Sequence, residues 1–283
     1  MRHVPGVTPR RGENASVRPA IVVRRGLSAL TAVLLTATAA ACGDPAPAGP
    51  VAASSSAPAT GPDPAAARSD LAARAALAVD RRFVALYTFD QPGQPSRAVV
   101  ATVALDGSWR VDIPGGALSG STDVSIVQNN TGVYQCSLTS VANPVTPSCV
   151  RVADAGRRVP QAYDPKVERI FRQWLRVFTD RQSALSVTHG VALPGSQGGD
   201  CFSIDSISAS MDAPVDIGIY CYAADGLLTA AKVDFGTLTI ASQAAAAPST
   251  VDFPGPIVTA DPLGLDAPPP PPAPVIPSVL PSA

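Results

Sequence analysis

The sequence predicts an α+β fold that is mainly antiparallel β: a curved meander sheet, or half-barrel, with one or two helices packed on its concave face. Three observations lead to this prediction. Short segments in which apolar and polar residues alternate recur along the chain, which is typical of half-buried strands. Asp-Gly pairs, the preferred residues of tight hairpin turns, join two pairs of these segments. One strongly amphipathic segment, residues 164–180, separates the strands into two groups.

An apolar run near the N-terminus predicts export. Residues 27–41 follow the pair Arg24-Arg25 and, at about 1.5 Å per helical residue, span about 22 Å, which is short for a bilayer core of about 30 Å. The run ends in AAAC, which resembles a bacterial lipobox and implies a diacylglyceryl group on the Cys42 sulfur. We therefore expect a lipid-anchored protein on the extracytoplasmic face of a bacterial cell membrane. An ordinary signal peptide and a retained membrane helix are the alternatives, and the arginine pair also resembles a twin-arginine signal.

Composition divides the chain into four parts. A lipoprotein signal peptide is expected at residues 1–41. Residues 42–66, rich in Ala, Pro and Ser, should form a tether, and residues 254–283, which contain PPPPPAP, should form a disordered tail, because neither has enough large apolar side chains to bury a core. Residues 67–253 remain as one domain. With 21 Lys and Arg against 22 Asp and Glu, the chain has no basic excess, so we expect no nucleic-acid partner.

The strands of the first group begin with RFVALYTFD, whose large and apolar side chains share one face: Phe83, Ala85, Tyr87 and Phe89. RAVVATVAL and SWRVDIP then form a hairpin about Asp106-Gly107, and TDVSIVQNN pairs with TGVYQCSLT. The second group is CFSIDSIS, VDIGIYCYA and LLTAAKVDF, the last two joined by Asp225-Gly226. Consecutive hairpins of this kind predict an antiparallel meander.

Four cysteines follow Cys42, and their surroundings predict two local disulfides. Cys136 and Cys149 flank the turn-like SVANPVTPS, and Cys201 and Cys221 flank SASMDAPVD, so each pair should face across its own hairpin. Cysteines opposite one another on neighbouring antiparallel strands lie within disulfide reach. The other connectivities, free thiols and a zinc site are the alternatives, although no Cys-x-x-Cys spacing favours zinc.

Two helices are predicted. The first, residues 69–80, is rich in alanine and has Ser69 as its N-cap. The second, residues 164–180, has Asp164 as its cap and Pro165 at its first helical position. Its apolar side chains fall on one stripe, Val167, Ile170, Phe171, Trp174, Leu175 and Phe178. The stripe either packs on the sheet as core or roofs an apolar groove, and both require the same residues. The candidate groove residues are Val167, Ile170, Phe171, Trp174 and Phe178.

The sequence shows no catalytic constellation. Downstream of Cys42 there is one histidine, His189, in a strand-like segment, where a structural role is expected. No G-x-S-x-G, P-loop or dinucleotide-binding glycine motif is present. The aspartates of the last hairpins do not match a calcium loop and are expected to be solvated: Asp200, Asp205, Asp212 and Asp216. We therefore expect neither an enzyme nor a cofactor or metal site.

The order of these features resembles that of the LolA/LprG-like lipoproteins of bacterial envelopes. The likeness covers residues 67–258 and is strongest in DIGIYCYAADGLLTAAKVDFGTLTIASQ, while DGSWRVDIP resembles the early hairpin of that family. The resemblance implies a curved sheet whose apolar concave face, closed by helices, can hold acyl chains, and it implies no particular site residue. The expected function is binding of a lipid or acylated amphiphile. The alternative is a non-enzymatic envelope module that binds a protein partner.

Overall fold

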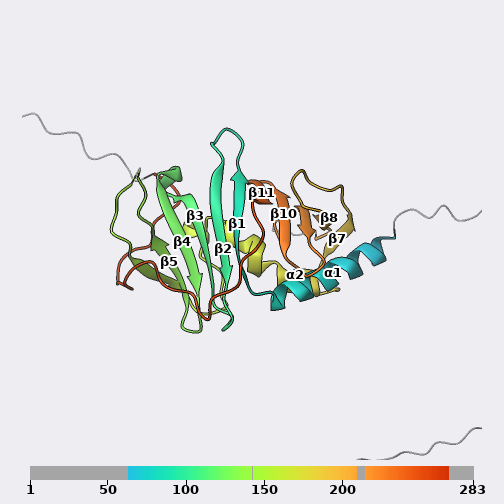
Figure 1. Cartoon of the computed structure of the whole chain (residues 1–283), viewed down its shortest axis with the longest axis horizontal. Coiled ribbons are helices and arrows are strands. Elements are labelled where there is room, and N and C mark those ends of the chain that lie inside the picture. The colour runs from blue at the N-terminus through green and yellow to red at the C-terminus, as the bar shows by residue number, and fades with distance from the viewer. Residues whose placement is uncertain (1–62, 142, 209–213, 268–283) are drawn as a thin grey trace, which may run out of the picture. The chain divides into compact units, whose positions relative to one another are not determined.

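The computed structural model describes residues 63–141, 143–208 and 214–267. Within these ranges eleven strands form one antiparallel sheet in the order β6-β5-β4-β3-β2-β1-β11-β10-β9-β8-β7. The sheet is curled and unclosed, and two helices accompany it (Figure 1). The mainly antiparallel prediction is therefore confirmed. Cys42 and the predicted signal peptide lie outside the described residues.

The sheet consists of two meanders. The first contains β1 (Phe83–Asp90), β2 (Arg97–Val103), β3 (Trp109–Ala117), β4 (Thr122–Gln128), β5 (Val133–Ser137) and β6 (Cys149–Ala153). The second contains β7 (Leu185–His189), β8 (Asp200–Ser206), β9 (Gly218–Tyr222), β10 (Leu228–Val233) and β11 (Gly236–Ile240). The last strand pairs with the first, with Tyr87 opposite Ile240, so the two meanders form one sheet (Figure 1).

The first helix, α1 (Pro64–Asp80), begins earlier than the sequence predicts. Asp63 is its N-cap, because the Asp63 carboxylate accepts a hydrogen bond of 2.9 Å from the backbone N–H of Ala65. Proline at the first helical position needs no hydrogen-bond partner, which favours a start at Pro64. The prediction of Ser69 as the cap is wrong, and the helix extends into the segment expected to be tether.

The second helical segment, residues 167–179, is also different from the regular helix that was predicted. Lys166 has a left-handed backbone with φ of 69°, so helical structure begins after it and Pro165 lies outside the helix. A π-helical turn at Arg169–Gln173 then precedes the short α2 (Leu175–Thr179). A π-turn widens the helix by one residue per turn and is frequent at functional sites. It places Arg172 and Gln173 on the wall of the pocket described below.

Both helices pack in one hydrophobic core with the sheet. The Phe171 ring lies 5.0 Å from that of Tyr87 on β1, and the Phe178 ring lies 5.1 Å from that of Tyr220 on β9. Leu71 of α1 belongs to the same cluster. All five candidate groove residues are buried in this core, with exposed fractions between 0% and 5%.

Both disulfides form in the predicted pairing. Cys136 lies opposite Cys149 on β5 and β6, and Cys201 lies opposite Cys221 on β8 and β9. Their side chains belong to two small clusters separate from the main core. The disulfides close loops with sequence separations of 13 and 20 residues, and a loop of this length stabilises a fold by about 2–4 kcal/mol. Met211, within the SASMDAPVD segment between Cys201 and Cys221, lies outside the described residues.

The segment after β11 corrects the predicted disordered tail. Cys149 N–H donates to the carbonyl of Pro256 at 2.9 Å, and Val258 N–H donates to the carbonyl of Cys149 at 2.8 Å, so the segment runs parallel to the edge strand β6. The Gln135 side chain then accepts from Leu263 N–H at 2.7 Å and donates to the Leu263 carbonyl at 2.9 Å. Residues 254–267 are therefore part of the fold. The physical reason is backbone pairing with an open sheet edge, which composition does not reveal.

No helix of the described part is long and apolar enough to cross a membrane.

Candidate functional site

A pocket of about 340 Å³ opens where the first meander meets the helical segment. Trp109, Gln128 and Val133 line it, and they form one row across three strands, because Trp109 pairs with Gln128 and Gln128 pairs with Val133. Residues 156–159, which follow β6, and several residues of the helical segment complete the wall. The volume lies near the lower end of the range for small-molecule sites, roughly 300–1,000 Å³.

Part of this wall is apolar. Trp109 and Val133 are buried members of the main core, and Val159 is a buried residue of the same cluster. Val177, on the helical segment, faces the pocket and packs against that core. The strand ends therefore present a hydrophobic surface at the pocket.

Four arginines line the rest of the pocket: Arg157, Arg158, Arg172 and Arg176. Within the described residues none of them forms an ion pair with an acidic side chain. The Arg158 guanidinium lies 5.0 Å above the Trp174 ring, which is a cation–π contact. Arg172 donates to the carbonyl of Val79 at 3.0 Å, at the end of α1. Burial, and then the positive charges of Arg82 and Arg176, lower the pKa of Arg172, and the Asp80 carboxylate opposes this shift in part. The pocket is therefore electropositive.

Glu168 is the acidic residue of the pocket wall. It is only 2% exposed, and a hydrogen bond to the Asp164 side chain stabilises its protonated form. Burial raises the pKa of Glu168 well above its usual range, and the nearby Asp164 carboxylate raises it further. The raised pKa favours the neutral form of the carboxyl group, which offsets the charge of the arginines less than a carboxylate would. Gln173, also on the wall, has a buried side-chain N–H₂ group that lacks a partner in the described part of the chain.

Behind the pocket, a network of buried charges holds the helical segment on the sheet. The Arg169 guanidinium forms an ion pair with Asp164, and its Nη1 lies 3.7 Å from Oδ1 of Asp216. The Trp174 indole N–H donates to Oδ2 of Asp216 at 2.9 Å, and the Tyr220 hydroxyl donates to the Asp216 carbonyl at 2.6 Å. The prediction that Asp216 is a solvated hairpin residue is wrong, because the tertiary fold places it under Arg169 and Trp174.

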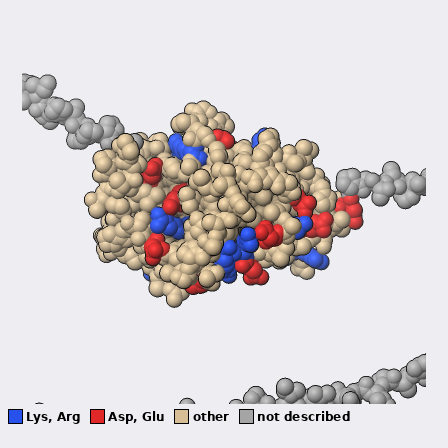
Figure 2. All heavy atoms as spheres, in the orientation of Figure 1, with Lys and Arg blue, Asp and Glu red and all other residues tan. Residues whose placement is uncertain are grey.

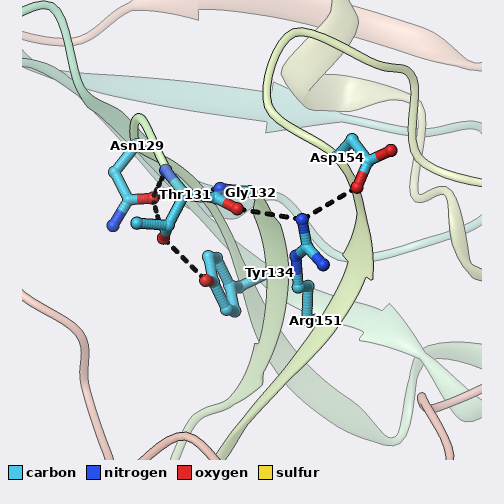
Figure 3. Close-up of polar contacts among 6 residues, drawn as sticks. All are labelled: Asn129, Thr131, Gly132, Tyr134, Arg151 and Asp154. Atoms are coloured by element: carbon cyan, nitrogen blue, oxygen red, sulfur yellow. Dashed lines mark hydrogen bonds and ion pairs between the residues drawn. The ribbon is translucent and has the colours of Figure 1, made fainter.

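Polar contacts also hold the loop that carries Arg157 and Arg158 (Figure 3). The Arg151 guanidinium donates to the Thr131 carbonyl at 3.0 Å and to the Asp154 carboxylate at 2.8 Å. Asn129 Oδ1 accepts from the backbone N–H of Thr131 at 2.8 Å, and the Thr131 hydroxyl lies 2.7 Å from the Tyr134 hydroxyl. These contacts connect the β4–β5 turn to the start of the loop, so both sides of the pocket are positioned together.

The candidate groove residues predicted from the sequence do not line the pocket. Of the candidate groove residues, Trp174 contacts a pocket arginine, and all five pack as core. His189 is half-exposed, 3.5 Å from Asp70, and does not line this pocket. The pocket residues that sequence reasoning missed are Trp109, Arg157, Arg158, Glu168, Arg172 and Arg176. The arginine pair in GRRVP and the lone Glu168 beside the apolar stripe were the available signals, and neither is specific.

Among the described residues no group of three or more His, Cys, Asp or Glu side chains could hold a metal ion. Comparison with models of known protein families gives no match, and no curated protein sequence matches the chain. On the face shown in Figure 2, charges of both signs are interspersed on a largely uncharged surface.

Replacing Glu168 with glutamine should flatten the pH dependence of stability. The folded-state pKa of Glu168 lies above its unfolded value of about 4.3, so its stabilising contribution is complete below that value and is lost as the pH rises through the folded-state pKa. We expect the free energy of unfolding of the wild type, relative to that of Glu168→Gln, to fall as the pH rises above about 4.3. Urea unfolding of both proteins across pH 4–9 measures the difference, and parallel curves would show that Glu168 is not a buried neutral acid.

Proposed function

We propose that this protein is a membrane-anchored extracytoplasmic lipoprotein whose folded domain binds a lipid or another acylated amphiphile of the cell envelope. The observation that carries this proposal is the pocket, in which an apolar wall of Trp109, Val133, Val159 and Val177 meets a set of arginines. An amphiphile has the same division into an apolar and a polar part. Ligand sites in proteins are mostly apolar concavities with a few polar groups that orient the ligand.

The curled sheet serves, in this proposal, as a half-barrel with both helices on its concave face. Its support is the single core that joins α1, the helical segment and one face of strands from both meanders. The disulfides lie in separate clusters, as expected if they occupy the other face. The pocket then lies at the strand ends that the helical segment borders, which is where the acyl chain would enter.

A non-enzymatic module that binds an envelope protein is the second candidate. The observation that favours it is the filled core, because the apolar stripe packs directly on the sheet and is at most 5% exposed. Side chains fill the space between the helical segment and the sheet. In the amphiphile proposal the acyl chain of the ligand must therefore occupy the pocket itself.

Native mass spectrometry of the full mature protein, purified from a bacterial envelope, tests amphiphile binding. We expect a co-purifying amphiphile on the wild type. Val177→Asp should abolish it, because a charge in the apolar wall is costly beside an acyl chain. The matched control is Val191→Asp, at an exposed position that does not line the pocket, and it should retain the ligand. Wild-type protein that carries no amphiphile and takes up no added acyl compound would contradict the proposal and favour the protein-binding alternative.

The Cys42→Ala variant should leave the membrane fraction or remain unprocessed. The reason is the sequence AAAC, in which Cys42 is the residue that would carry the acyl anchor. Fractionation of cells and the mass of the mature chain provide the measurement. A variant that still sediments with membranes at the mature size would show that another feature holds the protein there.

A further inference from the structure

The four arginines of the pocket indicate which chemical group the polar end of a ligand would have. We infer that the pocket is an anion site, which binds a phosphate or carboxylate group through Arg157 and Arg176, with Arg158 and Arg172 beside them. For an amphiphile this inference rests on the proposed function, since it names the chemistry of the head group. A free phosphate or carboxylate compound would use the same contacts.

The first support is unpaired positive charge. Elsewhere in the described part of the chain, Arg74 pairs with Asp200, Arg81 with Asp225 and the exposed Arg151 with Asp154, although others, such as Arg181, have no acidic partner there. Arg157 and Arg176 are exposed on the pocket wall, and neither has an ion pair with a described acid. A guanidinium has a planar fork of donors that matches the two oxygens of a carboxylate or phosphate.

The second support is repulsion among the cations themselves. Arg172 is partly buried, and the charges of Arg82 and Arg176 both oppose its protonated form. Its guanidinium donates to carbonyls of α1, including that of Val79, which are neutral partners, and the Asp80 carboxylate, whose effect is the smallest, offsets only part of the repulsion. Like charges held together are destabilising unless a counter-charge is present. An anion between the arginines would supply it.

The third support is independent of the arginines. Gln173 lies on the pocket wall, and its buried side-chain N–H₂ group has no hydrogen-bond partner among the described residues. Buried polar groups without partners are costly, and native proteins usually satisfy them. The amide N–H₂ group is a donor, and the partner that would satisfy it is an acceptor such as an anionic oxygen.

The two tryptophans of the chain provide the measurement. Trp109 lines the pocket and Trp174 contacts Arg158, so intrinsic fluorescence should respond to a bound ligand. The probes, used below their micelle concentrations with the full mature protein, are dodecyl phosphate, the uncharged dodecyl maltoside, and inorganic phosphate. We expect dodecyl phosphate to bind at least about tenfold more tightly than dodecyl maltoside, since one charge-assisted hydrogen bond is worth about that factor.

The test variant is the double substitution Arg157→Gln/Arg176→Gln. Neither side chain has a described contact that the fold requires, and circular dichroism checks the folding; if the double variant unfolds, the two single variants replace it. It should lose the preference for dodecyl phosphate and keep the binding of dodecyl maltoside. The matched control, Arg181→Gln/Lys232→Gln, removes the same charge from exposed positions that do not line the pocket, and should keep the preference.

The outcomes separate this inference from the proposed function. Equal binding of the two dodecyl compounds by the wild type would overturn the anion site and leave amphiphile binding intact. Binding of inorganic phosphate without either dodecyl compound would support the anion site and contradict the amphiphile. Equal loss of preference in the test and control variants would show an effect of net charge and overturn the site. If no probe binds, both proposals fail.

Discussion

Replacing Trp174 with alanine should lower the free energy of unfolding by about 3–5 kcal/mol. The indole is among the largest fully buried side chains, and the cavity left by its removal is surrounded by rings and strands that cannot close over it. The substitution also removes the donor to Oδ2 of Asp216 and the surface on which Arg158 stacks. Urea unfolding monitored by circular dichroism measures the loss. Trp174→Phe is the control that keeps an aromatic ring, and it should lose only about 1–3 kcal/mol, the cost of an unsatisfied buried acceptor.

The Trp174→Gln variant separates core from ligand site at this position. Because Trp174 packs in the main core, we expect its thermal midpoint to fall while the binding of dodecyl maltoside per folded molecule stays unchanged. A loss of binding larger than the loss of folded protein would contradict this expectation. It would show that the apolar stripe of the helical segment contacts the ligand.

Replacing Arg169 with glutamine should cost about 3–5 kcal/mol, because it leaves the buried carboxylate of Asp164 without its cation. The Asp164 side chain is 1% exposed, so water cannot take the place of Arg169, and Asp216 loses the same counter-charge. The matched control is Arg74→Gln, since Arg74 also pairs with an aspartate but that partner, Asp200, is 56% exposed. An exposed pair contributes about 0–1 kcal/mol.

The double variant Arg169→Gln/Asp164→Asn tests the cause of that loss. If an unpaired buried charge is responsible, removing Asp164 as well should recover part of the stability, and the two substitutions should be clearly non-additive in urea unfolding. Equal losses for Arg169→Gln and Arg74→Gln would show that burial of Asp164 does not make its pair with Arg169 special.

Much of the secondary structure was predictable because its signals are local. The alternation in residues 83–90, the Asp-Gly turns and the cysteines at matching distances from a turn each depend on neighbours along the chain. The start of α1 was missed although Asp63-Pro64 has the same form as Asp164-Pro165. The first pair marks a helix start and the second lies before a left-handed Lys166, so the surrounding contacts decide whether that signal is used.

Antiparallel hairpins, two local disulfides and an amphipathic segment between two strand groups could all be predicted from the order of residues along the chain. The pairing of β11 with β1, the course of residues 254–267 along the edge of β6, and the pocket lined by Trp109, Glu168 and four arginines became evident only from the folded arrangement. The physical reason is the range of each effect. Alternation assigns a side chain to a face of its strand, but the neighbour of a strand depends on hydrogen bonds and burial between segments far apart in the chain. The charge of a pocket and the raised pKa of Glu168 also depend on which segments pack together, so they become visible only in the folded protein.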